Sequence, residues 1–452
     1  MTPALVHSTA LPDGTPEVPV AIVGAGACGL VAALSLRNAG VDCVVLERDA
    51  QPSGSTALSS GLIPACGTRM QRALGIDDSV ELFSQDIDRK AHGTAAPHLV
   101  RAYTTAVGPA IDMLADRHGL DFHVQQGFLF PSHSVLRMHS VAEKTGAAFV
   151  SYLERAAYAA GADIVTEAIV RSLWFDDATR RVAGLSFERP DGALEHLRCN
   201  ALVLACNGFG GNAAMVRELL PEMRDAPFAG HTGNDGSAIA WGRAMGARLA
   251  DLGGYQGHGS WATPHGALIS WAIMMEGAIQ LNAHGERFHD ETGGYSEAAV
   301  KVLAQPGGVA WDIMDAPLLA LARTFPDFCA AEAAGAVRQC ADAQSLAALI
   351  GADPATVARS CAKAPKRPLL APFHVVKVTG ALFHTQGGLD IDTHCRVLHE
   401  DGTPFPNLLA AGGAARGVSG NAVWGYMSGN GLLSAVGGGA IAAATAVEML
   451  QA

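Results

Sequence analysis

The hydrophobic and polar positions near the start of the chain predict a strand, a tight turn, a helix and a second strand. Val20 to Val23 is an apolar strand, and a glycine-rich turn runs from Gly24 to Gly29. The helix is expected from Leu30 to Asn38, and the apolar run Cys43 to Leu46 forms the next strand. A strand, a helix and a strand in this order are typical of a Rossmann-type α/β unit.

The turn between the first strand and the helix has the spacing GxGxxG. Gly24 and Gly26 allow the backbone to approach a pyrophosphate closely, and Gly29 lets the helix touch the strand. The positive N-terminus of the helix then faces the phosphates. Glu47, which ends the second strand, can hold ribose hydroxyls. The pattern favours a dinucleotide over a turn without a ligand, and by itself it leaves NAD and FAD open.

The middle of the chain changes from helices to short strands. Strands are expected at Asp163 to Leu173, Arg181 to Glu188 and Leu197 to Ala205, with turns between them. Such a meander predicts a small antiparallel sheet rather than a third βαβ unit. The later strand Leu408 to Ala411 meets Gly412 and Gly413, and these lead towards an apolar C-terminal helix.

That helix, Gly431 to Leu450, is nearly uncharged and long enough to suggest a membrane span. It consists mostly of Gly and Ala, which makes it marginal in lipid, so we expect a buried helix and no membrane span. At the other end, Met1 to Glu17 lacks the basic and apolar regions of a signal peptide. We expect this segment to be a loose tail.

Composition and charge indicate the kind of protein and argue against some classes of binding partner. The 452 residues are 49% hydrophobic and 16% charged, as in a globular enzyme with a large core. The net charge of −12 and the lack of a basic run argue against nucleic acid. Nine scattered cysteines without a CxxC pair indicate reduced thiols in a cytoplasmic protein, and we expect no metal site.

The pattern predicts an α/β protein with two parts after the tail of residues 1–17. Residues 18–257 and 384–452 form a discontinuous Rossmann-type nucleotide-binding domain with an inserted antiparallel sheet. Residues 258–383 have strand and helix patterns of their own, with a Pro-rich, basic stretch at Ala364 to Pro372, and are expected to form an α+β capping domain.

The chain resembles the fumarate reductase and succinate dehydrogenase flavoprotein superfamily, which also contains the 3-ketosteroid dehydrogenases. The matching stretches arrive in the family order along nearly the whole chain: Gly24 to Glu47, Ser53 to Gly61, Leu202 to Asn212, Gly233 to Gly236, Gly285 to Phe288, His384 to Leu389 and Leu409 to Gly431. This resemblance implies FAD rather than NAD. Because no histidine lies between Ser55 and Gly61, where membrane-bound relatives attach the flavin covalently, we expect noncovalent FAD.

The resemblance also implies which residues contact the cofactor. The C-terminal helix starts near Asn430, and its free N–H groups can stabilise a reduced, anionic flavin ring. The alternative is a plain packing helix. The expected FAD-binding residues are Gly24, Gly26, Gly29, Glu47, Arg48, Ser55, Thr56, Ser60, Gly61, Val170, Cys206, Asn207, Gly208, Asp235, Gly413, Asn430, Gly431 and Leu432.

Two tyrosines stand where the fumarate reductases have catalytic arginines. Tyr295 follows the Arg-Phe-His-Asp-Glu stretch that ends at Glu291, and Tyr426 precedes Gly429. The reductases' proton path falls at apolar residues here. Tyrosines at these places resemble the 3-ketosteroid Δ1-dehydrogenases, which implies that Tyr295 is the general base. Tyr426, with an N–H near Gly429 or Asn430, then hydrogen-bonds the ketone oxygen. The alternative for each is a core aromatic.

Three further residues match substrate-contacting positions of the superfamily or lie beside them. His384 falls where the fumarate reductases bind a substrate carboxylate, and His258 falls at another substrate-contacting histidine. Arg416 can anchor a carboxylate, and a salt bridge to a capping residue is the equal alternative. The histidines can equally be ordinary core or surface residues.

Together these features predict an FAD-dependent oxidoreductase of CH–CH bonds that introduces an α,β double bond into a ketone or oxo-acid, or reduces one. We expect a cyclic substrate no larger than a steroid. The alternatives are a fumarate reductase-like reductase of an unsaturated carboxylate, a flavin oxidase or hydroxylase, and a flavoprotein subunit. The chain has no haem or iron–sulfur motif, so electrons must pass to an external acceptor of unknown identity.

Overall fold

The N-terminal strand, turn and helix form as the hydrophobic pattern predicts. In the computed structural model, which describes residues 5–8 and 10–451, strand β2 covers Glu17–Val23 and helix α1 covers Ala27–Asn38. Strand β3, Cys43–Leu46, pairs with β2 in parallel, with Val23 opposite Leu46. The helix starts three residues earlier than the apolar pattern alone indicates, since Ala27 to Gly29 of the glycine turn already form its first turn.

A mixed sheet is built around these strands. Strand β10, Leu194–Leu204, lies parallel to β2 through its C-terminal half, and β20, Pro404–Ala410, lies parallel to the same half of β10 on the other side. The N-terminal half of β10 pairs antiparallel with β9, Arg181–Glu188. The predicted Rossmann-type sheet with an antiparallel insertion is therefore confirmed.

The first strand of the predicted meander is two strands. Asp163–Val165 is β7, which pairs in parallel with β3, and Ile169–Asp176 is β8, which pairs antiparallel with β9. The break lies at Glu167, whose positive φ of 53° interrupts the extended backbone. One continuous strand from Asp163 to Leu173 was the wrong interpretation, because the same stretch serves two different partners.

The expected loose tail needs a similar correction. Val6–His7 forms strand β1, which pairs in parallel with β8, and the His7 ring stacks on Trp174 at 4.4 Å. Leu11 is also buried. Residues 1–4 and 9 of the predicted tail lie outside the described residues.

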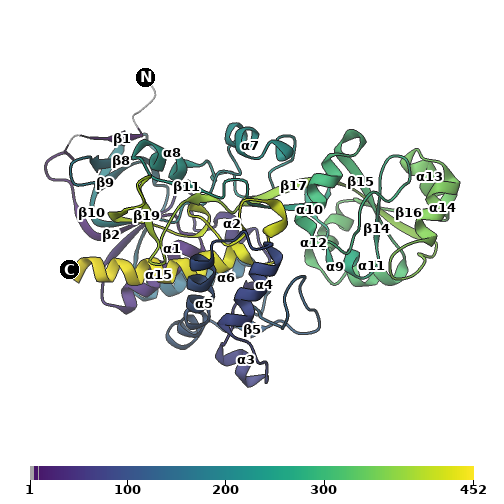
Figure 1. Cartoon of the computed structure of the whole chain (residues 1–452), viewed down its shortest axis with the longest axis horizontal. Helices are drawn as coiled ribbons and strands as arrows, with labels where there is room; N and C mark the ends of the chain where they lie inside the picture. The colour runs from purple at the N-terminus through teal and green to yellow at the C-terminus, as the bar shows by residue number, and fades with distance from the viewer. Residues whose placement is uncertain (1–4, 9, 452) are drawn as a thin grey trace. The chain divides into compact units, whose positions relative to one another are not determined.

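The C-terminal helix α15, Asn430–Gln451, is a core helix. It packs along α1 and along α5, Pro97–His118 (Figure 1). Its glycines allow this close approach: a Cβ on Gly439 would lie 2.5 Å from the backbone O of Cys28. By length and composition it can cross a membrane, with a mean hydropathy of 1.5, but 61% of that apolar window is buried in the chain.

The described residues divide into two compact units. The first comprises Met1–Met215, Gly230–Tyr255 and His384–Ala452, and the second comprises Val216–Ala229 and Gln256–Phe383. The other elements of the first unit are α2 Gly54–Ala57, β4 Ile63–Pro64, α3 Arg69–Ala73, α4 Val80–Lys90, β5 His123–Val124, β6 Met138–Ser140, α6 Gly146–Ala159, α8 Ser237–Ala244, β11 Leu249–Ala250, β18 Gly388–Leu389 and β19 Arg396–Leu398. Helix α7, Ala213–Leu219, begins in this unit.

The second unit is built on an antiparallel sheet with its own core. In this sheet β17, Phe373–Thr385, lies between β15, Val309–Met314, and β12, Tyr255–Ala262. The remaining elements are β13 Ala267–Leu268, α9 Ala272–Met275, β14 Ile279–Leu281, α10 Tyr295–Leu303, α11 Ala316–Ala322, α12 Pro326–Ala333, β16 Val337–Cys340, α13 Ala343–Ile350 and α14 Pro354–Ala362. Its buried side chains come from both the sheet and these helices.

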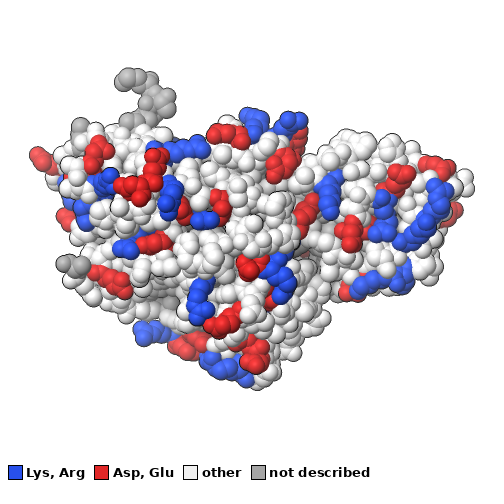
Figure 2. Space-filling view, viewed as in Figure 1, with Lys and Arg blue, Asp and Glu red and all other residues white. Residues whose placement is uncertain are grey.

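Charges are mixed on the visible surface. Figure 2 shows Lys and Arg side chains interspersed with Asp and Glu side chains, without a broad area of one sign on that face. The structure describes all nine cysteines, and each is a free thiol.

Candidate active site

The glycine turn is shaped by close backbone contacts. Gly24 has a φ of +103°, and a Cβ there would lie 2.6 Å from the backbone O of Ala205. At Gly29 a Cβ would lie 1.9 Å from the backbone O of Gly24, so a side chain at either position would force backbone apart. Gly26 differs, because the nearest heavy atom to its added Cβ is Thr56 Oγ1 at an ordinary 3.5 Å. Gly29 is thus needed for packing, whereas the space beside Gly26 is open to a ligand.

Glu47 is held in place at the end of β3. Its carboxylate accepts the N–H of Ala25 at 2.7 Å and that of Asp49 at 3.0 Å, and its side chain is buried. Burial raises the pKa of Glu47, while these backbone hydrogen bonds oppose the shift. A carboxylate has about four acceptor sites. The arrangement therefore leaves acceptor capacity for ribose hydroxyls.

The predicted Ser53 to Gly61 segment lies against the start of α1. Thr56 Oγ1 accepts the N–H of Ala27 at 3.2 Å, and Ser55 Oγ accepts Asn234 Nδ2–H at 2.8 Å. Ser60 is exposed, and Gly61 has a positive φ of 64°. Asn234 was missed by sequence reasoning, although it lies within the Gly233 to Gly236 motif.

Arg48 and Asp235 pair with each other rather than remaining independent. Arg48 Nη1 lies 3.2 Å from Asp235 Oδ2 and donates to the backbone O of Gly233 at 2.6 Å. The other carboxylate oxygen of Asp235 accepts the N–H of Ser237 at the start of α8. Both residues thus fix the loop before α8, and contact with a cofactor remains a prediction for them.

Distant segments meet around Asn207. Asn207 has a positive φ of 67°, and its Oδ1 accepts the N–H of Gly208 at 2.9 Å. A Cβ on Gly413 would lie 2.0 Å from this Oδ1, and a Cβ on Gly208 would lie 1.9 Å from Thr385 Oγ1. A side chain at either glycine would displace its neighbour, and two predicted cofactor segments, Cys206 to Gly208 and Gly413, meet the His384 to Leu389 stretch here.

Two predicted cofactor residues offer packing or backbone atoms rather than reactive side chains. Val170 is buried in β8. Burial raises the pKa of the Cys206 thiol to about 12, so it stays protonated at neutral pH.

The N-terminus of α15 carries an unused acceptor. Asn430 is fully buried, and its Oδ1 has no hydrogen-bond partner within the described part of the chain. The N–H of Asn430 donates to the backbone O of Met427 at 3.1 Å, so the predicted backbone donor is the N–H of Gly429 rather than that of Asn430. Leu432 is buried in the same first turn. An orphaned acceptor and first-turn amides fit a polar ring edge.

His384 and Tyr426 lie together at this helix end. Their ring centroids are 5.4 Å apart in an edge-to-face arrangement. A Cβ on Gly431 would lie 2.8 Å from His384 Nε2, so the imidazole packs directly on the first turn of α15. Gln386 Nε2 lies 2.9 Å from His384 Nδ1. Burial lowers the pKa of His384 to about 4. The ring is therefore neutral at neutral pH.

The second unit holds the other predicted pair. The ring of His258 stacks on that of Tyr295 with centroids 5.0 Å apart and planes 26° apart. Ser260 N–H donates to His258 Nδ1 at 3.1 Å, which places the ring proton of a neutral imidazole on Nε2. Burial lowers the pKa of His258 to about 3. Sequence reasoning missed Trp271, whose ring meets His258 edge-on at 5.8 Å.

Tyr295 is the first residue of α10. The positive end of this helix lies at Tyr295 and favours a phenolate there over one in mid-helix. The role of Tyr295 as a base remains a prediction. The two aromatic–histidine pairs belong to different units, and each is established within its own unit.

Arg416 is engaged by carboxylates of the first unit. Its Nε lies 2.6 Å from Asp251 Oδ2, and its Nη1 lies 3.4 Å from Asp390 Oδ1. The predicted alternative of a salt bridge to a capping residue is wrong in its partner, because Asp251 and Asp390 belong to the nucleotide-binding unit. Asp251 is the main partner of this guanidinium, because Asp390 also pairs with Arg248 at 2.7 Å. The ion pair with Asp251 makes Arg416 a poor anchor for a substrate carboxylate.

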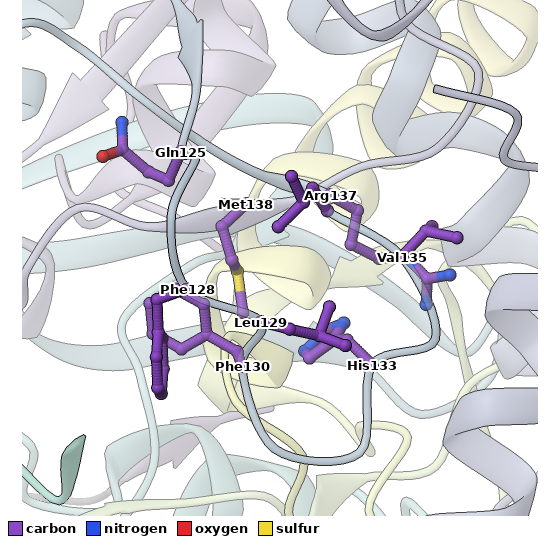
Figure 3. A pocket seen from close by; sticks show the side chains of 9 residues that line it. Gln125, Phe128, Leu129, Phe130, His133, Val135, Arg137 and Met138 are labelled. Atoms are coloured by element: carbon purple, nitrogen blue, oxygen red, sulfur yellow. The ribbon is translucent and has the colours of Figure 1, made fainter. Parts of the chain in front are cut away.

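A narrow hollow lies beside the turn before α15 (Figure 3). His133 borders it, and His133 Nε2 lies 3.0 Å from the backbone O of Ser428. The other lining residues are Gln125, Phe128, Leu129, Phe130, Val135, Leu136, Arg137 and Met138. The space has no room for a water molecule, so these side chains act as packing behind Ser428 and Gly429. Among the described residues, no group of three or more His, Cys, Asp or Glu side chains can hold a metal ion.

Comparison with protein families shows which family the chain belongs to. The FAD binding domain family, FAD_binding_2, matches residues 19–432. The chain belongs to this family. The glycine turn, the open space at Gly26 and the orphaned Asn430 Oδ1 fit FAD. The cofactor inferred from the motifs is thus confirmed.

Curated relatives are oxidoreductases of small molecules. An NADH:fumarate oxidoreductase of Klebsiella pneumoniae is 28% identical over 425 residues, which cover 89% of this chain and 45% of that protein. A urocanate reductase of Eggerthella lenta is 28% identical over 439 residues, covering 89% and 70%. A 4-oxocyclohex-2-ene-1-carboxylate 5-dehydrogenase of Sinomonas cyclohexanicum is 24% identical over 550 residues, covering 90% of each. The chain spans less than half the length of the first of these relatives.

Solved structures share the fold. A flavocytochrome c3 fumarate reductase in an open conformation superposes with a TM-score of 0.84 at 24% identity, covering 97% of this chain and 80% of that chain. A 3-ketosteroid Δ1-dehydrogenase from Sterolibacterium denitrificans gives 0.79 at 20% identity, covering 96% and 100%. The chain therefore has the fold of these flavoproteins.

The two glycines of the turn predict different outcomes on substitution. Gly29→Ala should lower the stability of the protein, since its Cβ meets backbone at 1.9 Å. Gly26→Ala should leave the fold intact and weaken FAD binding by about tenfold or more, because the Cβ fills the ligand's approach. Thermal unfolding of flavin-free protein and titration with FAD measure the two effects. If Gly26→Ala bound FAD as tightly as the parent does, the pyrophosphate would not lie beside Gly26.

Proposed function

We propose that this enzyme introduces a double bond next to a ketone, or reduces such a bond, in a cyclic ketone or oxo-acid. The charge state of the candidate residues carries this proposal. His258 and His384 are neutral, and Arg416 is paired with two carboxylates. A fumarate-like dicarboxylate needs cations, whereas a ketone oxygen needs hydrogen-bond donors.

The proposed reaction depends on two hydrogen-bond donors that bind the ketone oxygen of the substrate. Tyr426 O–H and the N–H of Gly429 bind the ketone oxygen and stabilise the enolate that forms when the α-proton leaves. Tyr295 takes this proton as general base, at the positive end of α10. Bound FAD supplies the acceptor for the β-hydride. In the reductive direction the same tyrosine returns the proton to the α-carbon.

The relatives support a small cyclic substrate. The Sinomonas relative is named for a six-membered ring that carries both a ketone and a carboxylate. We propose a cyclic ketone or oxo-acid of about this size, with FAD held noncovalently and residues 258–383 acting as the substrate-binding cap, in a cytoplasmic enzyme with an external electron acceptor.

Purified holoenzyme tests the function directly. Under anaerobic conditions a saturated cyclic ketone or cyclic oxo-acid should bleach the flavin, and an artificial acceptor dye should restore its colour. Succinate should fail to do so. Bleaching by succinate alone would support the carboxylate reductase instead, and peroxide release with an amine or phenol would support an oxidase or hydroxylase.

Tyr426→Phe tests the oxygen-binding role. Loss of one such donor costs about 100-fold or more in turnover, and FAD content should stay unchanged because the ring and its contact with His384 are retained. Tyr158→Phe, on the exposed face of α6, is the matched control. Steady-state rates with the best ketone measure the effect. Turnover equal to that of the parent would remove Tyr426 from the mechanism.

A further inference from the structure

A chain of hydrogen bonds runs from the first residue of α15 to His384. Asn430 Nδ2 donates to Ser419 Oγ at 3.0 Å, and Ser419 Oγ donates to Gln386 Oε1 at 2.9 Å. Gln386 Nε2 then meets His384 Nδ1 at 2.9 Å. Asn430, Ser419 and Gln386 are each less than 4% exposed, so water does not compete for these bonds.

The direction of the chain decides which ring nitrogen of His384 carries its proton. A serine hydroxyl has one hydrogen, and Ser419 gives it to the Gln386 carbonyl oxygen while accepting from Asn430. The amide nitrogen of Gln386 is then a donor, which makes His384 Nδ1 an acceptor. Thr385 O lies 3.3 Å from the same Nδ1 and would receive a proton only in the opposite tautomer. The bond from Gln386 to Nδ1 is shorter than the contact with Thr385 O, and it continues the network from Asn430. Both observations favour the form of His384 with its proton on Nε2.

The hydrogen-bond network of Asn430, Ser419 and Gln386 contains no negative charge that would favour a charged imidazole. Its members are two amides and one hydroxyl, in contrast to the carboxylate that commonly partners a protonated histidine. The ring also packs on the first turn of α15 at Gly431, where the positive end of the helix disfavours a second positive charge. His384 is thus presented beside Tyr426 as a second neutral donor.

We propose that Gln386 is a positioning residue that keeps His384 a neutral Nε2–H donor, and that it thereby makes the enzyme select an uncharged carbonyl oxygen over a carboxylate at this position. The selectivity part rests on the proposed function, whereas the tautomer part concerns the protein alone. Gln386 lies two residues from His384 in the motif His384 to Gly388, so the signal is present in the sequence.

Gln386→Glu is the decisive variant. A carboxylate in place of the amide accepts from Nδ1–H and stabilises the imidazolium, so the pKa of His384 should rise. Binding of a saturated carboxylate ligand such as cyclohexanecarboxylate should strengthen by about tenfold or more because it gains an ion pair, and binding of cyclohexanone should change much less. Gln386→Met removes the hydrogen bond without adding charge, and Gln344→Glu, exposed on α13, controls for an added carboxylate.

Nitrogen-15 NMR of the holoenzyme reads the tautomer without turnover. The signals of His384 are identified by their loss in His384→Asn. A proton on Nε2 at neutral pH in the parent, with protonation of both nitrogens in Gln386→Glu, supports the positioning role even if no ketone is oxidised. A proton on Nδ1 in the parent would overturn it. An unchanged ratio of ketone to carboxylate affinity in Gln386→Glu would overturn the selectivity.

Discussion

Tyr295→Phe should lower the rate of flavin reduction by a cyclic ketone by about 100- to 10,000-fold, the usual contribution of a positioned base. The phenyl ring keeps the stack on His258 at 5.0 Å, so the substitution removes only the hydroxyl that we propose as the base. Binding of the ketone should change much less, because the oxygen is held by other donors. Stopped-flow measurement of flavin bleaching separates the two effects.

The pH profile distinguishes a base from a packing residue. The pH dependence that a base at position 295 gives to the rate of the parent should be absent from Tyr295→Phe. Tyr158→Phe, which alters an exposed ring on α6, should retain both the rate and the profile. A Tyr295→Phe enzyme with the parent's rate and pH dependence would assign the base to another group and leave Tyr295 as a core aromatic.

Local motifs predict the cofactor half of this enzyme well. The turn from Gly24 to Gly29 requires glycines for reasons of backbone distance that are readable from the spacing, and α15 begins at Asn430, where the sequence places it. These features depend on neighbours in sequence. The same is true of Tyr295, whose place at the start of α10 follows Gly293 and Gly294.

The ion pairs that set the charge of the candidate site residues could not be predicted from local motifs. Arg416 is paired with Asp251, which is 165 residues distant, and no local pattern announces that contact. Strand β7 leaves the meander because β3 offers a parallel edge, which is also a tertiary choice. The ion pairs that set the charge state of the candidate site are therefore visible only in the folded chain.

A second buried network lies beneath His258. Gln280 Nε2 donates to Asp312 Oδ1 at 2.8 Å and to the backbone O of Gly259 at 2.9 Å. It thus braces β12, the strand that carries His258. Asp312 is fully buried, and its Oδ2 has no partner among the described residues. Burial raises the pKa of Asp312 to about 7, against the opposing hydrogen bonds from Gln280 and Ser260.

This carboxyl should make the second unit lose stability as pH rises. The folded state holds the proton more tightly than the unfolded chain, so the stabilisation is complete below the ordinary pKa of 3.8 and is lost as pH rises through about 7. A difference of about three pKa units corresponds to at most about 4 kcal/mol in the free energy of unfolding. The loss should be complete by about pH 8.

Asp312→Asn should remove this pH dependence, because an amide imitates the protonated carboxyl. The variant and the parent should unfold at the same urea concentration at about pH 3, below the ordinary pKa of 3.8, and the variant should be more stable at higher pH, with the full difference above about pH 8. Tryptophan fluorescence follows unfolding, since this unit contains Trp261, Trp271 and Trp311, three of the six tryptophans. Asp177→Asn, on an exposed turn, should leave the parent's pH dependence in place. Parallel curves for the parent and Asp312→Asn would mean that Asp312 is ionised in the folded protein, and the brace beneath His258 would then carry a negative charge.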